Sequence, residues 1–365
     1  MKLHLYFARR FLWAYLALFA VFGVFQALID LIDELRASDI GLSFAQVLTL
    51  TALKLPEGLY QLMPLVMILS TIALFLSLAR SSELVVARAA GRSGLTVLLA
   101  PLTVAFVIGA LAVAVVNPIV ATTSKRYAEM SEFYRHGDRA ALSIGSEGLW
   151  LRQGGPQGQS VIHAARANGE ATILYDVSFL VYAPDASGPV QRILAREARL
   201  DGQEWVLKQA RIWPLTGDQN PEAGATDHDT LRLASTLTQD SIRDRFGTPS
   251  AISLWDLPGF ITDLESAGFS ARRHVVWLQM ELAKPFFLVA MVMLGAGFTM
   301  RPTRLGRTAV AVLSAVLLGF GLYYVRNFAQ ILGENGQIAP LLAAWVPPLA
   351  SVLLALGLIL HIEDG

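Results

Sequence analysis

The chain has 365 residues, of which 54% are hydrophobic and 16% are charged, well below the roughly 25% of charged residues in soluble domains. Several apolar runs reach the roughly 20 residues that a helix needs to cross a bilayer, so the sequence predicts an integral membrane protein. Lys and Arg together number 29, as do Asp and Glu, so the net charge does not indicate a nucleic-acid partner, and we expect none. The absence of cysteine excludes disulfides, thiol catalysis and thiolate metal sites.

The first third of the chain contains three predicted membrane spans. Basic residues precede the first apolar run, which is too long for a signal peptide, so we expect a retained span. Ser43 can cap the next helix, which starts with an interfacial or tilted stretch and a proline-linked bend near Lys54–Glu57. Asn117-Pro118 is predicted to end the third span. The spans are Phe11–Ile32, about Leu59–Ala79 and about Leu95–Val116.

The polar stretch Arg80–Gly94 separates the second span from the third. A hydroxyl of Ser81 or Ser82 can accept a hydrogen bond from an N–H group in the first turn of a helix. Glu83 would lie near the positive end of the helix dipole, and Gly91 suits the left-handed position that ends a helix. The stretch therefore predicts a short helix outside the membrane.

From about Ile119 to Arg273 no segment could span a membrane. Short runs of alternating apolar and polar residues, rich in β-branched and aromatic side chains and divided by turn signals, predict strands with no helices between them. This pattern favours an all-β sandwich or roll. A helix from about Ser253 to Ala267 should lead back to three further spans, at about Val275–Met300, Thr308–Leu332 and Pro340–Leu360.

The basic residues of the short loops fall on one side of this six-span layout, which is the pattern of cytoplasmic loops. Both termini and the Arg80–Gly94 helix are therefore predicted to be cytoplasmic, and the β domain extracytoplasmic. The predicted fold is a six-helix membrane protein with an inserted all-β domain. Its parts are residues 1–118 with three spans and the short helix at 80–94, the β domain at 119–250, a connecting helix at 251–273, and three spans at 274–365.

Signatures of enzymatic chemistry are missing from the sequence. It has no phosphate-binding loop, no H-E-x-x-H motif and no G-x-S-x-G elbow, and its six histidines are scattered. We therefore predict no catalytic residues, cofactor or metal site. Glu281 and Lys284 lie three positions apart on one helix face, where they can form a structural ion pair or face a substrate. The ionisable residues within the spans, which face protein or water by default, are Asp30, Lys54, Glu57, Glu281, Lys284 and Arg326.

Four local motifs and the order of spans and β domain carry a family resemblance over the whole chain. The most specific motif is the stretch from Arg80 to Ser93, and the others are Gly148–Arg152, the loop from Phe298 to Arg307, and the turn and span from Leu332 to Pro347. On these motifs the chain resembles the LptF/LptG family, the permeases of the bacterial lipopolysaccharide-export ABC transporter. Within that family it is more similar to the LptG side.

The resemblance implies a permease that extracts lipopolysaccharide from the inner membrane and passes it through a β-jellyroll-like periplasmic domain to a periplasmic bridge. It implies that Arg80–Gly94 is a coupling helix, and the residues expected to contact an ATPase there are Ser82, Glu83, Leu84, Arg88 and Gly91. ATP hydrolysis would then occur on another chain, so this chain would not be an enzyme. The implied partners are lipopolysaccharide, a paralogous six-span permease (LptF-like), a dimeric cytoplasmic ATPase (LptB-like) and a single-span bitopic partner (LptC-like).

A lipid with several acyl chains and an anionic head group needs apolar walls and cations near the outer rim. Members of the family often carry basic residues at the periplasmic ends of the first and third spans, but the best-matching position in this first span is Asp30. The candidates in this chain are Arg36, Lys125 and Arg126, each of which can instead be an interface anchor. The alternative functions are a permease of another ABC-type lipid or lipoprotein exporter, and an envelope scaffold without transport activity.

Overall fold

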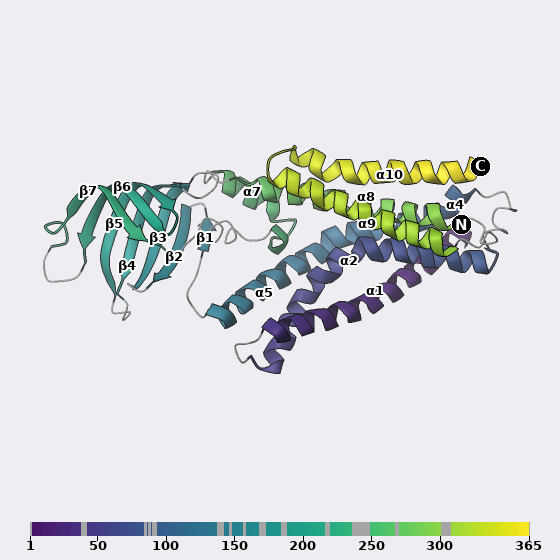
Figure 1. Cartoon of the computed structure of the whole chain (residues 1–365), viewed down its shortest axis with the longest axis horizontal. Coiled ribbons are helices and arrows are strands. Elements are labelled where there is room, and N and C mark those ends of the chain that lie inside the picture. Colours follow the sequence, from purple (N-terminus) through teal and green to yellow (C-terminus); the bar gives the residue numbers. More distant parts are fainter. Residues whose placement is uncertain are drawn as a thin grey trace. The chain divides into compact units, whose positions relative to one another are not determined.

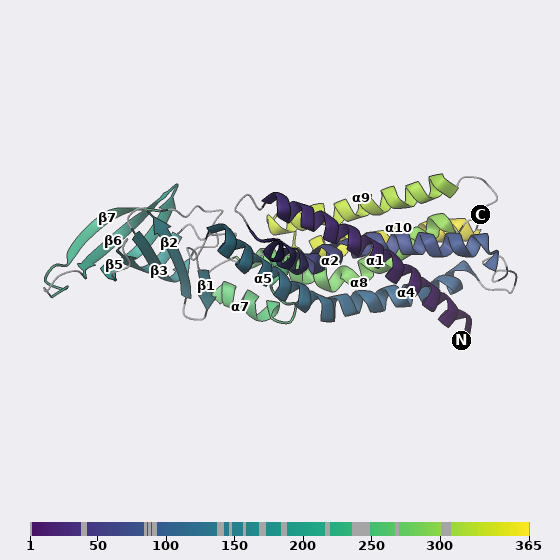
Figure 2. The ribbon, with the colours of Figure 1, turned by 90° about the horizontal axis from the view of Figure 1, so that it is seen from below.

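The computed structural model divides into two compact units, shown in Figures 1 and 2. The helical unit comprises Met1–Ser131, Ser250–Trp255 and Arg272–Gly365, and the β unit comprises Glu132–Pro249 and Asp256–Ala271. The structure describes residues 2–37, 42–83, 86, 89, 93–136, 142–145, 148–155, 158–167, 173–183, 188–215, 220–235, 249–266, 270–300 and 308–364.

Within these described ranges, six helices are long and apolar enough to cross a membrane, which confirms the predicted class. Ser43 caps the second of them as expected, since its hydroxyl accepts from the N–H of Gln46 at 3.4 Å. The third consists of α4 (Gly94–Leu111), a π-helix (Ala112–Val116) and α5 (Asn117–His136). The other five are α1 (Lys2–Ala37), α2 (Phe44–Arg80), α8 (Arg272–Thr299), α9 (Thr308–Glu334) and α10 (Pro340–Asp364).

Asn117-Pro118 does not end the helix that contains the predicted third span, because the helix continues to His136. Pro118 has no N–H to donate to the carbonyl of Ala114, four residues earlier. The indole Nε1 of Trp255, far away in the sequence, donates to that carbonyl at 3.1 Å. A proline is tolerated in a membrane helix when a neighbouring group takes over the freed carbonyl in this way.

The core of the helical unit surrounds α8, which packs against α2, α4, α9 and α10. In its most apolar stretch 78% of the residues are buried, against 11% in the corresponding stretches of α1 and α9. The helices α4 and α8 come close at Gly109, where an added Cβ would lie 2.7 Å from the Cα of Pro285. Small residues permit such close approach between membrane helices. Helices α1 and α9, in contrast, leave rows of large apolar side chains exposed.

The β unit contains a seven-stranded antiparallel sheet in which every strand lies beside its neighbours in sequence. This confirms the inserted β domain. The Greek-key crossings of a jellyroll do not occur among the described strands, which form a meander. A two-residue turn with Gly202 at φ 62° joins the fifth strand to the sixth. The strands are β1 (Leu142–Gly145), β2 (Gly148–Gly155), β3 (Gly158–Ala167), β4 (Ile173–Tyr182), β5 (Pro189–Asp201), β6 (Glu204–Pro214) and β7 (Thr226–Ala234).

One apolar layer stabilises the sheet. Trp205 on β6 is fully buried and meets Phe179 of β4 edge to face, with ring centroids 6.1 Å apart. The indole of Trp205 donates to the Oε1 of Gln153 at 3.4 Å, so its polar edge has a partner inside the core. The connecting helix α7 (Leu257–Ser266) follows the sheet. It begins at Leu257, later than the predicted start at Ser253 of the helix Ser253–Ala267.

Candidate functional site

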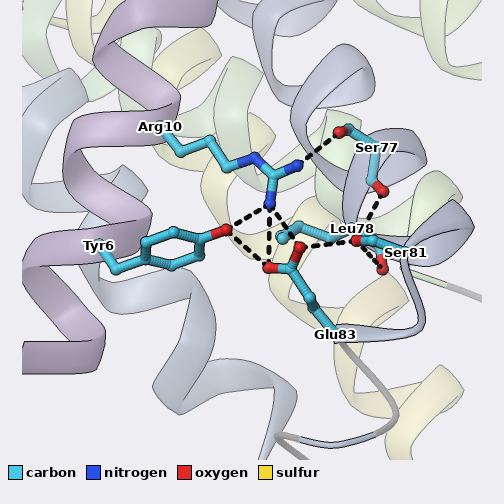
Figure 3. Close-up of polar contacts among 6 residues, drawn as sticks. All are labelled: Tyr6, Arg10, Ser77, Leu78, Ser81 and Glu83. Atoms are coloured by element: carbon cyan, nitrogen blue, oxygen red, sulfur yellow. Dashed lines mark hydrogen bonds and ion pairs between the residues drawn. The ribbon is translucent and has the colours of Figure 1, made fainter.

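A group of polar side chains surrounds Glu83 just beyond the end of α2 (Figure 3). Arg10 Nη1 donates to both carboxylate oxygens of Glu83, at 2.8 and 2.9 Å. Tyr6 and Ser81 each donate a hydroxyl to this carboxylate at 2.8 Å, and Arg10 Nη2 donates to Ser77 Oγ at 2.9 Å. We call these five residues the Glu83 cluster. It ties the segment that follows α2 to the beginning of α1.

Local helix geometry explains why these side chains meet. Tyr6 and Arg10 are four residues apart on α1, and Ser77 and Ser81 are four residues apart at the end of α2, so each pair lies on one helix face. Ser82 adopts a left-handed conformation with φ 57°, which ends α2 and turns the chain so that Glu83 comes back over the helix end. Ser81 acts here at the end of α2, with its hydroxyl 3.1 Å from the carbonyl oxygen of Ser77.

The structure gives Glu83 partners inside its own chain, whereas the sequence predicts for it a place at the start of the short helix and a contact with an ATPase. Ser82 and Glu83 are both described, and the N–H of Val86 donates to the carbonyl of Ser82 at 3.2 Å as in a helix. The other predicted coupling residues, Leu84, Arg88 and Gly91, lie outside the described residues. The contact with an ATPase therefore stays a prediction.

The hydrogen bonds also determine the acidity of Glu83. Partial burial alone would raise its pKa, but hydrogen bonds from Arg10, Ser81 and Tyr6 outweigh burial, and the pKa is lowered from its ordinary 4.5. A lowered folded-state pKa contributes stability that is complete above the unfolded value and is lost as the pH falls through the folded value.

We therefore expect Glu83→Gln to lower the free energy of unfolding at neutral pH by about 1 kcal/mol or less, because the ion pair is about one-third exposed. The difference between wild type and variant should shrink as the pH falls from 4.5, the ordinary pKa, through the lowered pKa of Glu83 in the folded protein. Denaturant unfolding in detergent at a series of pH values measures this difference in the free energy of unfolding. A difference that is the same at pH 7 and in acid would contradict the assignment.

A second set of polar contacts, the α1–α2–α5 cluster, joins these three helices near the end of α1. Lys54 Nζ lies 3.4 Å from Asp30 Oδ1. Asp30 occupies the position where the family resemblance implies a basic residue, and it forms an ion pair with the basic Lys54 of α2. Ser124 Oγ donates to Glu57 Oε2 at 2.9 Å. The remaining members are Gln26, which donates to Asp30 at 3.1 Å, and Tyr127, which donates to Glu34.

The three predicted head-group contacts lie beside this cluster in sequence. Arg36 is exposed in the last turn of α1, and Lys125 and Arg126 are exposed on α5. The bond from Tyr127 to Glu34 brings these parts of α1 and α5 together. The structure thus adds Lys54, whose side chain is 35% exposed, as a fourth cation on the same three helices.

A cavity of about 180 Å³ lies between α1, α2, α8 and α9. Its lining includes the amides of Gln26 and Gln61, the apolar Leu65 and Ile68, and the Tyr323 ring. This volume is below the roughly 300–1,000 Å³ of pockets that enclose drug-sized ligands. It is therefore too small to hold a lipid with several acyl chains.

The third polar group, the Glu281 cluster, is buried where α2, α5 and α8 meet. Lys284 Nζ lies 3.4 Å from Glu281 Oε1, and Asn117 Nδ2 donates to Glu281 Oε2 at 3.4 Å. Tyr60 of α2 donates its hydroxyl to Glu281, and Lys284 Nζ lies 3.0 Å from the centre of the Tyr60 ring. Only 1% of Glu281 and 5% of Lys284 is exposed. Sequence spacing predicted the pair Glu281–Lys284 but not Tyr60 or Asn117.

Comparison with known proteins agrees with this architecture. The sequence profile of the family described as "Lipopolysaccharide export system permease LptF/LptG" matches residues 5–361. The permease protein LptG of Escherichia coli K12 is 23% identical over 317 residues, covering 85% of this chain and 84% of that protein. LptG of Haemophilus influenzae is 23% identical over 355 residues, covering 93% and 92%. The chain, with its six apolar helices and inserted β sheet, therefore belongs to the LptF/LptG family of lipopolysaccharide export system permeases of the inner membrane.

Proposed function

We propose that this permease is an LptG-type subunit that uses ATP hydrolysis on a separate dimeric ATPase to extract lipopolysaccharide from the inner membrane. The Glu83 cluster is the observation that carries the proposal. A partner that moves the segment after α2 also pulls on α1, because Arg10 joins the two with hydrogen bonds of 2.8 to 2.9 Å. The helix α1 borders the cavity, so this movement changes the cavity's width.

The loops rich in Lys and Arg favour a cytoplasmic position for both termini and for the segment that contains Glu83. The β unit then lies in the periplasm, where it passes the lipid to a bridge protein. The exposed apolar faces of α1 and α9 suit a paralogous six-span permease and a single-span helix, which together complete a cavity that is too small in this chain alone. Arg36, Lys54, Lys125 and Arg126 bind the anionic head group.

The test is to express the chain together with a soluble ATPase and a second six-span permease from the same source, and to purify it through a tag on this chain. Recovery of all three proteins, with ATP hydrolysis that increases in lipopolysaccharide-containing nanodiscs, supports the proposal. A stable homo-oligomer with no ATPase would contradict it.

Within that complex we expect Arg10→Gln and Glu83→Gln to lower the lipid-stimulated ATP hydrolysis by similar factors, about fivefold at most for a partly exposed pair. The control is Arg9→Gln, which removes one positive charge from an exposed neighbouring position on α1. If only Glu83→Gln had an effect, the ATPase itself rather than α1 would be the partner of Glu83.

A further inference from the structure

The Glu281 cluster lies far from the Glu83 cluster along α2, yet both use side chains of that helix. Tyr60 precedes Ser77 by about 25 Å at the α-helical rise of 1.5 Å per residue. We propose that Glu281, Tyr60 and Asn117 form a positioning site that holds α2 against the start of α5 and against Ser250–Trp255, the segment that follows the β sheet. The inference rests on the proposed function, because it assigns to this site the step that links ATP hydrolysis to lipid movement.

Asn117 connects the cluster to the returning segment, Ser250–Trp255. Its Nδ2 donates to Glu281 Oε2 at 3.4 Å, while its Oδ1 accepts from the backbone N–H of Leu254 at 2.8 Å. The side chain is 1% exposed, so both ends of its amide are used in a site without room for solvent. One side chain thereby joins α5, α8 and the segment that precedes α7.

The backbone before Asn117 supports the same contact. The π-helix Ala112–Val116 ends directly at this residue, and such insertions occur frequently at functional sites. Pro118 frees the carbonyl of Ala114, and the Trp255 indole donates to it at 3.1 Å. The returning segment thus supplies two consecutive donors, the N–H of Leu254 and the Nε1 of Trp255, to the junction of α4 and α5.

The hydrogen bonds to the carboxylate of Glu281 make the cluster sensitive to a movement of α2. The carboxylate is removed from solvent and accepts hydrogen bonds from three donors on α2, α5 and α8. A buried polar network holds one arrangement firmly when it is complete and is costly when a member is displaced. A shift of α2 that moves Tyr60 away from Glu281 therefore favours a second arrangement, in which Asn117 and the segment bound to it move as well.

The test uses the complete complex with its ATPase, reconstituted in proteoliposomes with lipopolysaccharide and an acceptor for the released lipid. In Tyr60→Phe and Asn117→Ala, ATP hydrolysis should stay within about twofold of wild type, while the lipid released per ATP falls about two- to thirtyfold, the range for residues in a coupling network. The control is Trp345→Phe, which removes another interhelical bond to α8, from the indole to Gln279 at 3.1 Å. The lipid released per ATP by this variant should equal that of the wild type.

The double variant separates a common site from independent effects. If both residues act through Glu281, Tyr60→Phe with Asn117→Ala should release about as much lipid per ATP as the more severe single variant. Additive losses, an unchanged ratio, or a parallel fall of hydrolysis and release in step with the unfolding temperature would each overturn the inference. A wild-type chain that neither binds nor stimulates the ATPase would instead overturn the proposed function, and this inference with it.

Discussion

Glu281→Ala is expected to lower the free energy of unfolding by about 3–5 kcal/mol, the cost of breaking a buried ion pair by removing one partner. The variant leaves the ammonium group of Lys284 without its carboxylate, and only 7% of that side chain is exposed. It also leaves the hydroxyl of Tyr60 and the amide of Asn117 without their acceptor. Denaturant titration in mixed micelles, followed by tryptophan fluorescence, measures the loss.

Replacing both charged partners provides the matched control. Glu281→Leu combined with Lys284→Met removes the pair and keeps the volume, so we expect the double variant to be more stable than Glu281→Ala, since buried pairs often break even against apolar residues. A loss below about 1 kcal/mol in the single variant, the value of an exposed pair, would show that the pair is solvated.

The second large effect is expected at Gly109, where α4 meets α8. A Cβ there would lie 2.7 Å from the Cα and 3.1 Å from the Cβ of Pro285, so the two helices must separate. We expect Gly109→Ala to destabilise the protein by about 1–3 kcal/mol, the usual cost of overpacking. The same titration measures it.

Gly321→Ala on α9 is the control for this substitution. Among the described residues, no atom beyond its chain neighbours and the nearby backbone of α9 lies within 4 Å of the Cβ that it would add. Only the better helix propensity of alanine therefore acts, a gain of up to about 1 kcal/mol. Because both variants gain this propensity, the difference between their free energies of unfolding isolates the contact with Pro285. Equal stabilities would mean that α4 and α8 are farther apart at this point.

The overall fold could be predicted because its signals are local in the sequence. Runs of apolar residues indicated the spans, and alternation indicated the strands of the inserted domain. The continuation of the third helix past Pro118 could not be predicted in this way. It depends on Trp255, a donor that reaches the carbonyl of Ala114 only after the chain has passed through the strands of the β sheet.

The candidate sites, too, could be predicted only where the signal is local in the sequence. Glu83 and the pair Glu281–Lys284 were found because a motif or a helical spacing marks them. Their partners Arg10, Tyr60 and Asn117 lie on other helices, and nothing within a short stretch of sequence states which helices pack together. The four-residue spacing of Tyr6 and Arg10 was the available signal, and it indicates only that both side chains share one face of α1.

The length of α2 predicts where its two polar clusters lie with respect to the bilayer. About 20 helical residues cross the roughly 30 Å hydrocarbon core, which is the stretch of α2 from about Tyr60 to Arg80. We therefore expect the Glu83 cluster to lie at one face of the membrane and the Glu281 cluster near the opposite face, with Lys54 and Asp30 at the level of the lipid head groups. A single unbroken helix therefore spans the distance between them, so a piston-like or tilting movement of α2 reaches both leaflets at once.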